Sequence, residues 1–102
     1  MNTDELVAYS RSRFDHAAVK RVLKEKYQAK MIFAHAGGLW QAGPPLLIQL
    51  HICDPVTPMV LLDLYENPIK IIPQELIELA QQRWQEQMNA WLVEYDEVSK
   101  NR

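Results

Sequence analysis

The chain has 102 residues, of which 48% are hydrophobic and 24% are charged, and its formal net charge at pH 7 is −2. Such a length fits one domain with one modest core, and such a composition excludes a disordered chain. The small negative charge also excludes a global field that would draw the chain onto nucleic acid or anionic lipid.

Cysteine content and apolar runs bear on the cellular compartment. Cys53 is the only cysteine, so no internal disulfide can form, which is typical of a reducing compartment. The acidic start, Met-Asn-Thr-Asp-Glu, lacks the basic and then apolar order of a secretion signal. The apolar runs are far shorter than the roughly 18 residues that a membrane span requires. We therefore expect a cytoplasmic protein that has no contact with a membrane.

The first predicted element is a helix over residues 1–28. Thr3 or Asn2 can cap it, and the acidic residues that follow suit the positive end of a helix dipole. Apolar residues then recur every four positions in two adjacent columns, which are Phe14, Ala18 and Val22, and Val19, Leu23 and Tyr27. This spacing indicates a broad apolar face.

The same helix is basic. Between positions 11 and 30 there are seven Lys or Arg and two acids. We expect a strip on one side of the helix that consists of Arg13, Lys20, Arg21 and Lys24. Such a strip can neutralise phosphates, so it is a candidate contact for nucleic acid or for an acidic partner. A solvated charged face is the favoured interpretation, because no aromatic residue interleaves with the strip to stack on bases.

A first β-hairpin is predicted after this helix. The apolar runs Met31–Ala36 and Leu39–Ala42 flank Gly37-Gly38, and glycine accepts the positive φ of a tight turn. Gly43-Pro44-Pro45 ends the second strand, because proline cannot donate to a ladder. The following segment, Leu46–Cys53, is ambiguous between a short buried helix and a buried strand. The helix is favoured, since leucine is abundant there and β-branched residues are few.

A second hairpin and a long helix complete the chain. Met59–Tyr65 and Ile69–Ile71 read as strands around the turn Glu66-Asn67-Pro68. Pro73 suits a helix start, and neither Gly nor Pro follows it, so a helix is predicted over residues 73–99. The fold class is therefore α+β in one domain, residues 1–102. The two hairpins, within residues 29–72, could join into one antiparallel four-stranded sheet that helices cover.

The last helix carries an apolar stripe. Ile77, Trp84, Trp91 and Val98 recur every seven residues, and Ala80, Met88 and Tyr95 lie three or four positions away. Most of this stripe is expected to cover the sheet. A helix of this length spans about 40 Å, however, whereas a compact domain of about 100 residues has a diameter of roughly 35 Å. We therefore predict that the distal part overhangs and forms a protein interface, composed of Trp84, Met88, Trp91, Tyr95 and Val98.

The layout resembles short proteins encoded by large contractile-tailed bacteriophages. The features in common are the basic helix Val19–Tyr27, the Gly37-Gly38 hairpin, the short helix that begins with proline, the Glu66–Ile69 turn, and the aromatic closing helix from Trp84 to Glu97. The resemblance covers most of the chain and implies no active site. It implies a role in phage assembly or as an accessory component, in the host cytoplasm or in the virion.

The sequence contains no strong catalytic or ligand-binding motif. The chain has no nucleophile elbow and no P-loop, and Gly37-Gly38 reads as a turn. His51 and Cys53 are two residues apart, too close for the usual zinc knuckle, and Cys53 is interpreted as a small packing residue. We therefore expect no catalytic residue, no metal site and no cofactor.

Two functions follow as hypotheses. The first is a non-catalytic interaction module that associates with itself or with another protein through its terminal helices. The alternative is a small nucleic-acid-associated regulator that uses the basic strip, with weak binding expected. An enzyme with an unrecognised site is the least favoured hypothesis.

Overall fold

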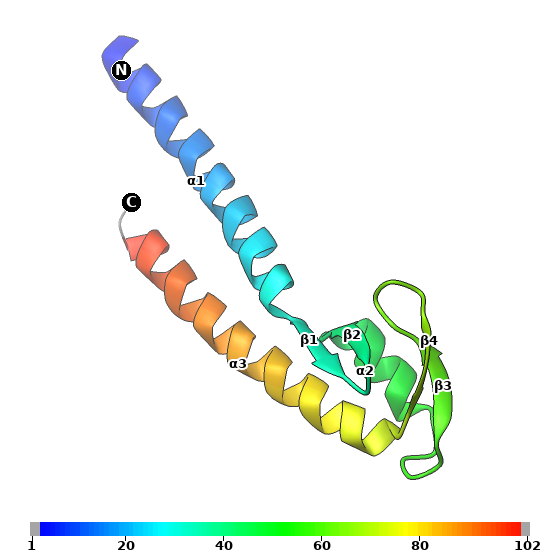
Figure 1. Cartoon of the computed structure of the whole chain (residues 1–102). Helices are drawn as coiled ribbons and strands as arrows, with labels where there is room; N and C mark the ends of the chain where they lie inside the picture. Colours follow the sequence, from blue (N-terminus) through cyan, green and yellow to red (C-terminus); the bar gives the residue numbers. More distant parts are fainter. Residues whose placement is uncertain (1–2, 101–102) are drawn as a thin grey trace.

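The structure is a computed structural model, and it describes the backbone of residues 3–100 and the side chains of residues 16–100. Figure 1 shows three helices and two hairpins. Their order along the chain is α1 (Thr3–Lys30), β1 (Ile32–His35), β2 (Gly38–Gln41), α2 (Pro44–His51), β3 (Met59–Leu62), β4 (Pro68–Ile71) and α3 (Pro73–Lys100). The predicted α+β class and element order are confirmed, and the first helix ends at Lys30 instead of residue 28.

The molecule is elongated. Its principal extents are 66 × 23 × 21 Å and its radius of gyration is 19.3 Å. A compact domain of this length would have a radius of gyration near 13 Å. The molecule is longer than the roughly 35 Å of a compact domain, because α1 and the distal half of α3 project together from the remainder of the chain (Figure 1). We call residues 3–30 and 84–100 the arm, and residues 31–83 the head.

The first hairpin is confirmed, but its turn lies one residue earlier than predicted. His35 pairs with Gly38, so the turn residues are Ala36 and Gly37, with φ of 53° and 84°. Positive φ at both central residues is the mark of a type I′ turn, whose twist suits a two-residue hairpin. Gly38 belongs to β2 and is buried. A Cβ at this position would lie 3.0 Å from Ile69 Cγ1 and 3.2 Å from Asp63 Cβ, so Gly38 is required for close approach of the second hairpin.

The hairpins do not join into the four-stranded sheet that was expected. β1 pairs only with β2, and β3 only with β4, each pair antiparallel. The hairpins meet instead where β3 has ended: the Leu64 N–H donates to the Leu39 carbonyl at 2.7 Å, and the Leu39 N–H donates to Asp63 Oδ2 at 3.1 Å. The Asp63 carboxylate thus takes the place of the backbone carbonyl that would accept from the Leu39 N–H in a continuous sheet. The two hairpins therefore remain separate sheets.

The helix interpretation of Leu46–Cys53 is confirmed, with α2 spanning Pro44–His51. Prolines occupy the first helical positions, where their missing N–H has no intrahelical partner to lose. The β3 strand ends at Leu62, three residues before the predicted end at Tyr65. Asp63 turns the chain there, with its N–H donating to the Asn67 carbonyl at 3.0 Å.

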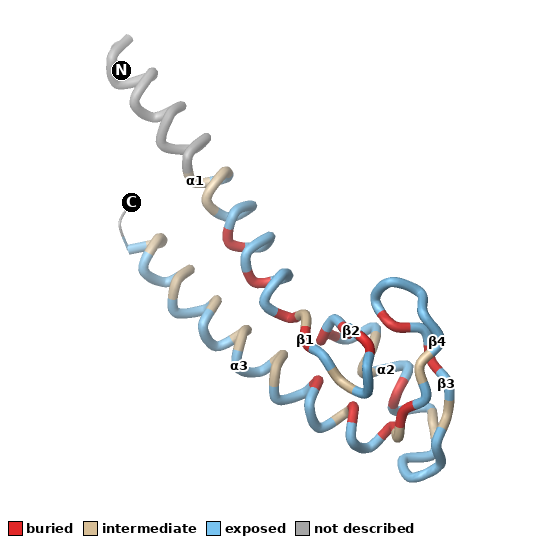
Figure 2. The backbone as a smooth tube through the Cα atoms, viewed as in Figure 1, coloured by how far each residue is buried: buried red, intermediate tan, exposed pale blue. Residues whose placement is uncertain are grey.

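The core lies in the head. Its buried members come from α3, α2 and both hairpins, and they include Leu76, Ala80, Leu50, Trp40, Phe33, Leu61 and Ile71. Figure 2 shows the buried residues gathered in the head and along the lower part of α1, whereas distal α3 is half-buried or exposed. Within the part of the chain that the structure describes, no helix is both long and apolar enough to cross a membrane.

Candidate functional site

The seam between α1 and α3 is the most structured feature of the arm. Leu23 and Tyr27, one turn apart on α1, are buried at 6% and 2% exposure. The Tyr27 ring stacks on the Trp91 ring, with centroids 5.7 Å apart and planes 8° from parallel. Of the two predicted apolar columns of α1, the one that contains Leu23 and Tyr27 thus faces α3. Val22, from the other column, is 59% exposed.

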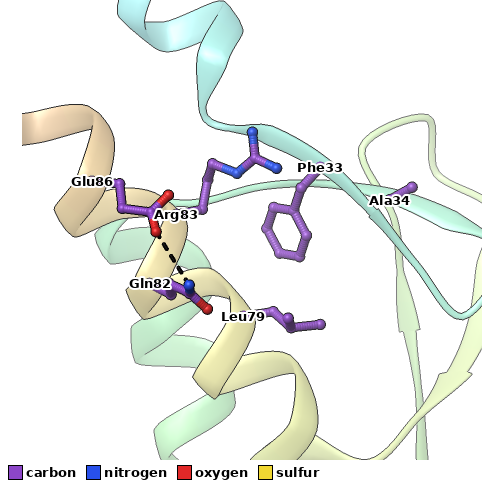
Figure 3. A pocket seen from close by; sticks show the side chains of 6 residues that line it. All are labelled: Phe33, Ala34, Leu79, Gln82, Arg83 and Glu86. Atoms are coloured by element: carbon purple, nitrogen blue, oxygen red, sulfur yellow. Dashed lines mark hydrogen bonds between the residues drawn. The ribbon is translucent and has the colours of Figure 1, made fainter. Parts of the chain in front are cut away.

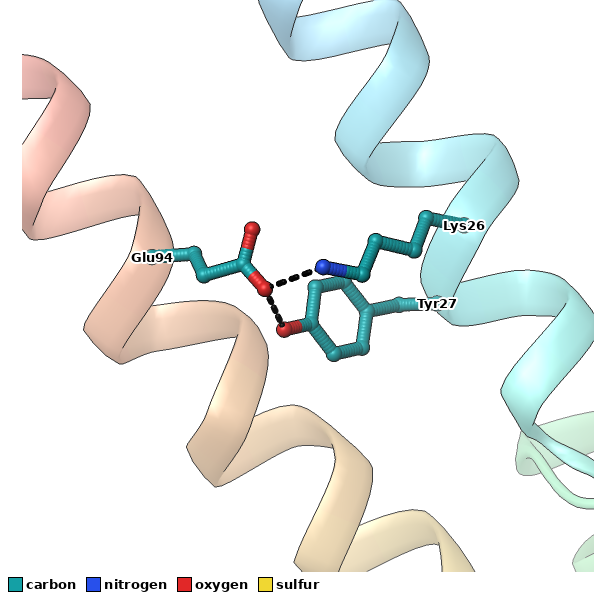
Figure 4. A network of polar contacts seen from close by, with 3 residues as sticks. All are labelled: Lys26, Tyr27 and Glu94. Atoms are coloured by element: carbon teal, nitrogen blue, oxygen red, sulfur yellow. Dashed lines mark hydrogen bonds and ion pairs between the residues drawn. The ribbon is translucent and has the colours of Figure 1, made fainter.

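A polar cluster lies on one flank of the seam (Figure 4). The Glu94 carboxylate accepts hydrogen bonds from the Lys26 ammonium and from the Tyr27 hydroxyl. The hydrogen bond to Glu94 raises the pKa of Lys26 and that of Tyr27. The pKa of Glu94 is lowered, by the hydrogen bond from Lys26 first and by that from Tyr27 second. The cluster therefore favours a charged carboxylate and a charged ammonium, and it fixes the register of the two helices.

The predicted interface residues all lie on α3, and each is half-buried: Trp84, Met88, Trp91, Tyr95 and Val98. Trp84 and Met88 pack against the core of the head. Trp91 contacts Tyr27 of α1, and the Lys20 Nζ lies 5.9 Å from the Tyr95 ring centroid. The distal helix does project beyond the head, but α1 accompanies it and covers one side of the stripe. A partner for the side that remains open is still a prediction.

The open side of the stripe is continued by an exposed apolar residue. Leu92 is 59% exposed, and it lies four residues after Met88 and three before Tyr95, so these three share one flank of α3. The adjacent residue Val93 is equally exposed at 59%. Val93 lies instead beside Glu97, four residues later, on a charged part of the helix surface. Leu92 therefore extends the stripe, whereas Val93 is an isolated apolar residue.

The basic strip is only partly described. Lys20, Arg21 and Lys24 are exposed on α1, and the side chain of Arg13 lies outside the described residues. The Lys20 ammonium lies over the Tyr95 ring, and the attraction between a cation and the face of an aromatic ring explains this position. The strip therefore borders the seam with α3 and is not a separate surface.

Two of the clefts in the head have linings that bear on possible chemistry. The first, of about 220 Å³, lies between β1 and α3 (Figure 3). Its polar side chains are already hydrogen-bonded, since Gln82 donates to Glu86 at 3.1 Å and the Arg83 guanidinium donates to the Lys30 carbonyl at 3.4 Å. The second, of about 460 Å³, is open and is bordered by His35, Lys70 and Glu75. Neither cleft is lined by a Ser, Thr or Cys nucleophile.

The His51 and Cys53 pair is placed apart from both clefts. The Cys53 thiol donates to the Gln49 carbonyl at 3.2 Å, a local contact at the end of α2, and His51 is exposed. Among the residues that the structure describes, no group of three or more His, Cys, Asp or Glu side chains is placed to hold a metal ion.

The most constrained polar residue, Asp63, was not singled out by the sequence. It is 9% exposed. Its Oδ1 accepts from the N–H groups of Asn67 at 2.9 Å and Tyr65 at 3.0 Å, and its Oδ2 accepts from the Leu39 N–H at 3.1 Å. These bonds, led by that from Asn67, lower the pKa of Asp63. The only signal in the sequence for the role of Asp63 is its position four residues before Asn67 at a turn. No sequence signal distinguishes Glu94 from the other acidic residues of α3.

The chain matches no known protein family, no curated protein and no solved structure.

Proposed function

We propose that the protein is a non-catalytic interaction module whose arm binds a protein partner along the open side of the α3 stripe. The observation that carries this proposal is the half-buried state of the stripe from Trp84 to Val98 after α1 has packed against it. Aromatic residues and methionine are enriched at interface cores, and Trp and Tyr are among the residues that contribute most to binding energy. The resemblance to phage proteins favours an assembly or accessory role for the complex.

The shape of the molecule supports this proposal. An arm that projects from a head loses most of the burial that a compact fold provides, and it leaves apolar side chains such as Leu92 in water. Large exposed apolar surface that polar residues border is typical of protein interaction sites. A partner that covers the Leu92 flank would remove this surface from water and hold the arm rigid.

Site-specific photo-crosslinking tests the proposal directly. A photoreactive phenylalanine analogue is placed at Leu92 or, as a matched control, at Val93, which has the same exposed fraction but lies off the stripe. The protein is expressed in cells of its natural host and irradiated. We expect a discrete protein adduct from position 92 and much less from position 93. Absence of any adduct at position 92, or equal adducts at both positions, would overturn the proposal.

A further inference from the structure

The two helices of the arm carry opposite charges. The described side chains of α1, residues 16–30, include five Lys or Arg and one Glu. In α3 there are six acidic residues and two basic ones. The one ion pair between these helices among the described side chains joins Lys26 to Glu94. Most of the charged side chains in the described part of each helix are exposed, so they are available to a surface of opposite sign.

The seam has two distinct flanks. Lys26 and Glu94 meet on one flank, and Lys20 and Tyr95 meet on the other. Lys24 lies four residues after Lys20, so it belongs to the Tyr95 flank, and Asp96 lies four residues after Leu92 and borders the same flank. The Tyr95 flank thus has a basic edge on α1, an apolar centre on α3 and an acidic edge beyond it.

We propose that the partner at the Tyr95 flank is a second copy of this chain, which packs α1 of each copy against α3 of the other in a four-helix bundle. This inference rests on the proposed function, whose partner it identifies. In a two-fold symmetric interface the same patch occurs on both sides, so a patch must be complementary to itself. A flank with one basic and one acidic edge around an apolar centre meets this condition, because rotation brings the basic edge of one copy over the acidic edge of the other.

The size of the arm suits such a dimer. The 28 residues of α1 span about 42 Å, and residues 84–100 of α3, which belong to the arm, span about 26 Å. Each helix is about 10 Å wide, so one face of the arm offers roughly 700 Å² per copy. Stable protein complexes bury about this much surface on each partner. Four-helix bundles also bury aromatic and aliphatic stripes of this heptad-like spacing between their layers.

Sedimentation equilibrium of the purified full chain tests the inference. We expect a mass of twice 11.9 kDa for the wild type. Leu92→Glu should give a monomer, because it buries a charge in the apolar centre. Val93→Glu should remain a dimer, since Val93 lies off the flank. Far-UV circular dichroism should show the same helix content for both variants, as both sites are exposed in the single chain.

Charge reversal tests the pairing of α1 with α3. Lys24→Glu and Asp96→Lys should each weaken self-association by about tenfold or more, and an equimolar mixture of the two should recover much of it as a heterodimer. Glu97→Lys, an equal charge change on the next residue, should have a smaller effect. Recovery in the mixture would support the proposed geometry.

The outcomes separate this inference from the proposed function. A wild type that is monomeric at about 100 µM overturns the inference, and so does a dimer that neither Leu92→Glu nor the charge reversals affect. If the adduct at position 92 in cells then contains a different protein, the interaction module stands and only its partner changes. An adduct of twice the chain mass, together with a dimer in solution, supports both.

Discussion

At the scale of single residues, Asp63 links the two hairpins of the head. Its carboxylate satisfies three backbone N–H groups, two in its own loop and one in the other hairpin. Hydrogen bonds to a charged acceptor are stronger than neutral ones, and loss of one partner leaves a buried donor unpaired. The two hairpins therefore depend on one charged side chain in place of a continuous sheet.

Acid should destabilise the protein through this residue. The pKa of Asp63 is lowered from its ordinary value of 3.8, chiefly by the hydrogen bond from Asn67. Its charged form thus contributes stability that is fully present above about pH 3.8 and is lost as the pH falls through the folded value. Asp63→Asn should lower the melting temperature at pH 7 and flatten the pH dependence below pH 4. Thermal unfolding at a series of pH values measures both effects.

Glu94 supplies the control for this prediction. Its pKa is also lowered, so Glu94→Gln should remove a part of the acid dependence without affecting the hairpins. Equal pH profiles for wild type and Asp63→Asn would contradict the role given to Asp63.

The first hairpin gives a second prediction at this scale. Gly38→Ala should destabilise the protein by about 1–3 kcal/mol, because the added methyl group is forced against Asp63 and Ile69 in a packed site. Gly37→Asn should be nearly neutral, since asparagine tolerates positive φ and is favoured in type I′ turns, and no atom lies within 4 Å of a Cβ there. Chemical denaturation measures both variants. Greater destabilisation by Gly37→Asn would show that backbone conformation, and not contact between the hairpins, limits this turn.

At the scale of elements, the arm depends on few contacts. The described part of α1 packs on α3 through Leu23, Tyr27 and the Glu94 cluster, and its connection to the head is through β1. Long helices in water are stabilised mainly by the packing of an apolar face. The two helices of the arm are therefore mutually dependent, whereas the first half of α3 is held by the core.

Loss of the Trp91 ring should open the arm and leave the head folded. Aromatic pairs contribute about 0.5–1.5 kcal/mol beyond their burial, so Trp91→Ala should let the amides of α1 exchange with solvent several-fold faster. The amides of β1 to β4 should keep their protection. Hydrogen exchange by mass spectrometry resolves the two regions, and Val93→Ala is the matched control. Equal acceleration in arm and head would mean that the two unfold as one unit.

At the scale of the whole molecule, the elongated shape is itself testable. Small-angle scattering of the Leu92→Glu variant, which the proposed interface predicts to be monomeric, should give a radius of gyration near 19.3 Å. A compact monomer of this length would give about 13 Å. A measured value near the smaller number would mean that the arm folds back onto the head.

The net charge of the whole molecule predicts weak binding to DNA. The chain has a net charge of −2, and the basic strip borders acidic α3. At about 150 mM salt, where the Debye length is about 8 Å, we expect at most weak binding that is independent of sequence and falls steeply with added salt. A salt titration of DNA affinity, with Lys24→Glu as the variant, measures this. A tight and sequence-specific complex would favour the alternative function, a nucleic-acid-associated regulator.

The sequence by itself determined the local structure of this protein. Hydrophobic periodicity and the residues that start or end an element located all three helices and both hairpins. These signals, such as a proline or a glycine, depend on a few neighbouring residues and need no tertiary contact. The apolar stripe of α3 was visible for the same reason. The turn at Ala36-Gly37 was placed one residue late, since a Gly-Gly pair leaves two registers open and only the packing of Gly38 against Asp63 selects between them.

Only the tertiary structure decided how the elements are arranged. Whether two hairpins merge depends on contacts between residues far apart in the chain, such as Leu39 with Asp63, and no local pattern encodes them. The same holds for the pairing of Tyr27 with Trp91 and Glu94 across more than sixty positions. Which side of α3 is covered by α1, and which is left for a partner, follows from this pairing. Periodicity shows that a helix has an apolar face, but only the position of its neighbour shows how much of that face remains open.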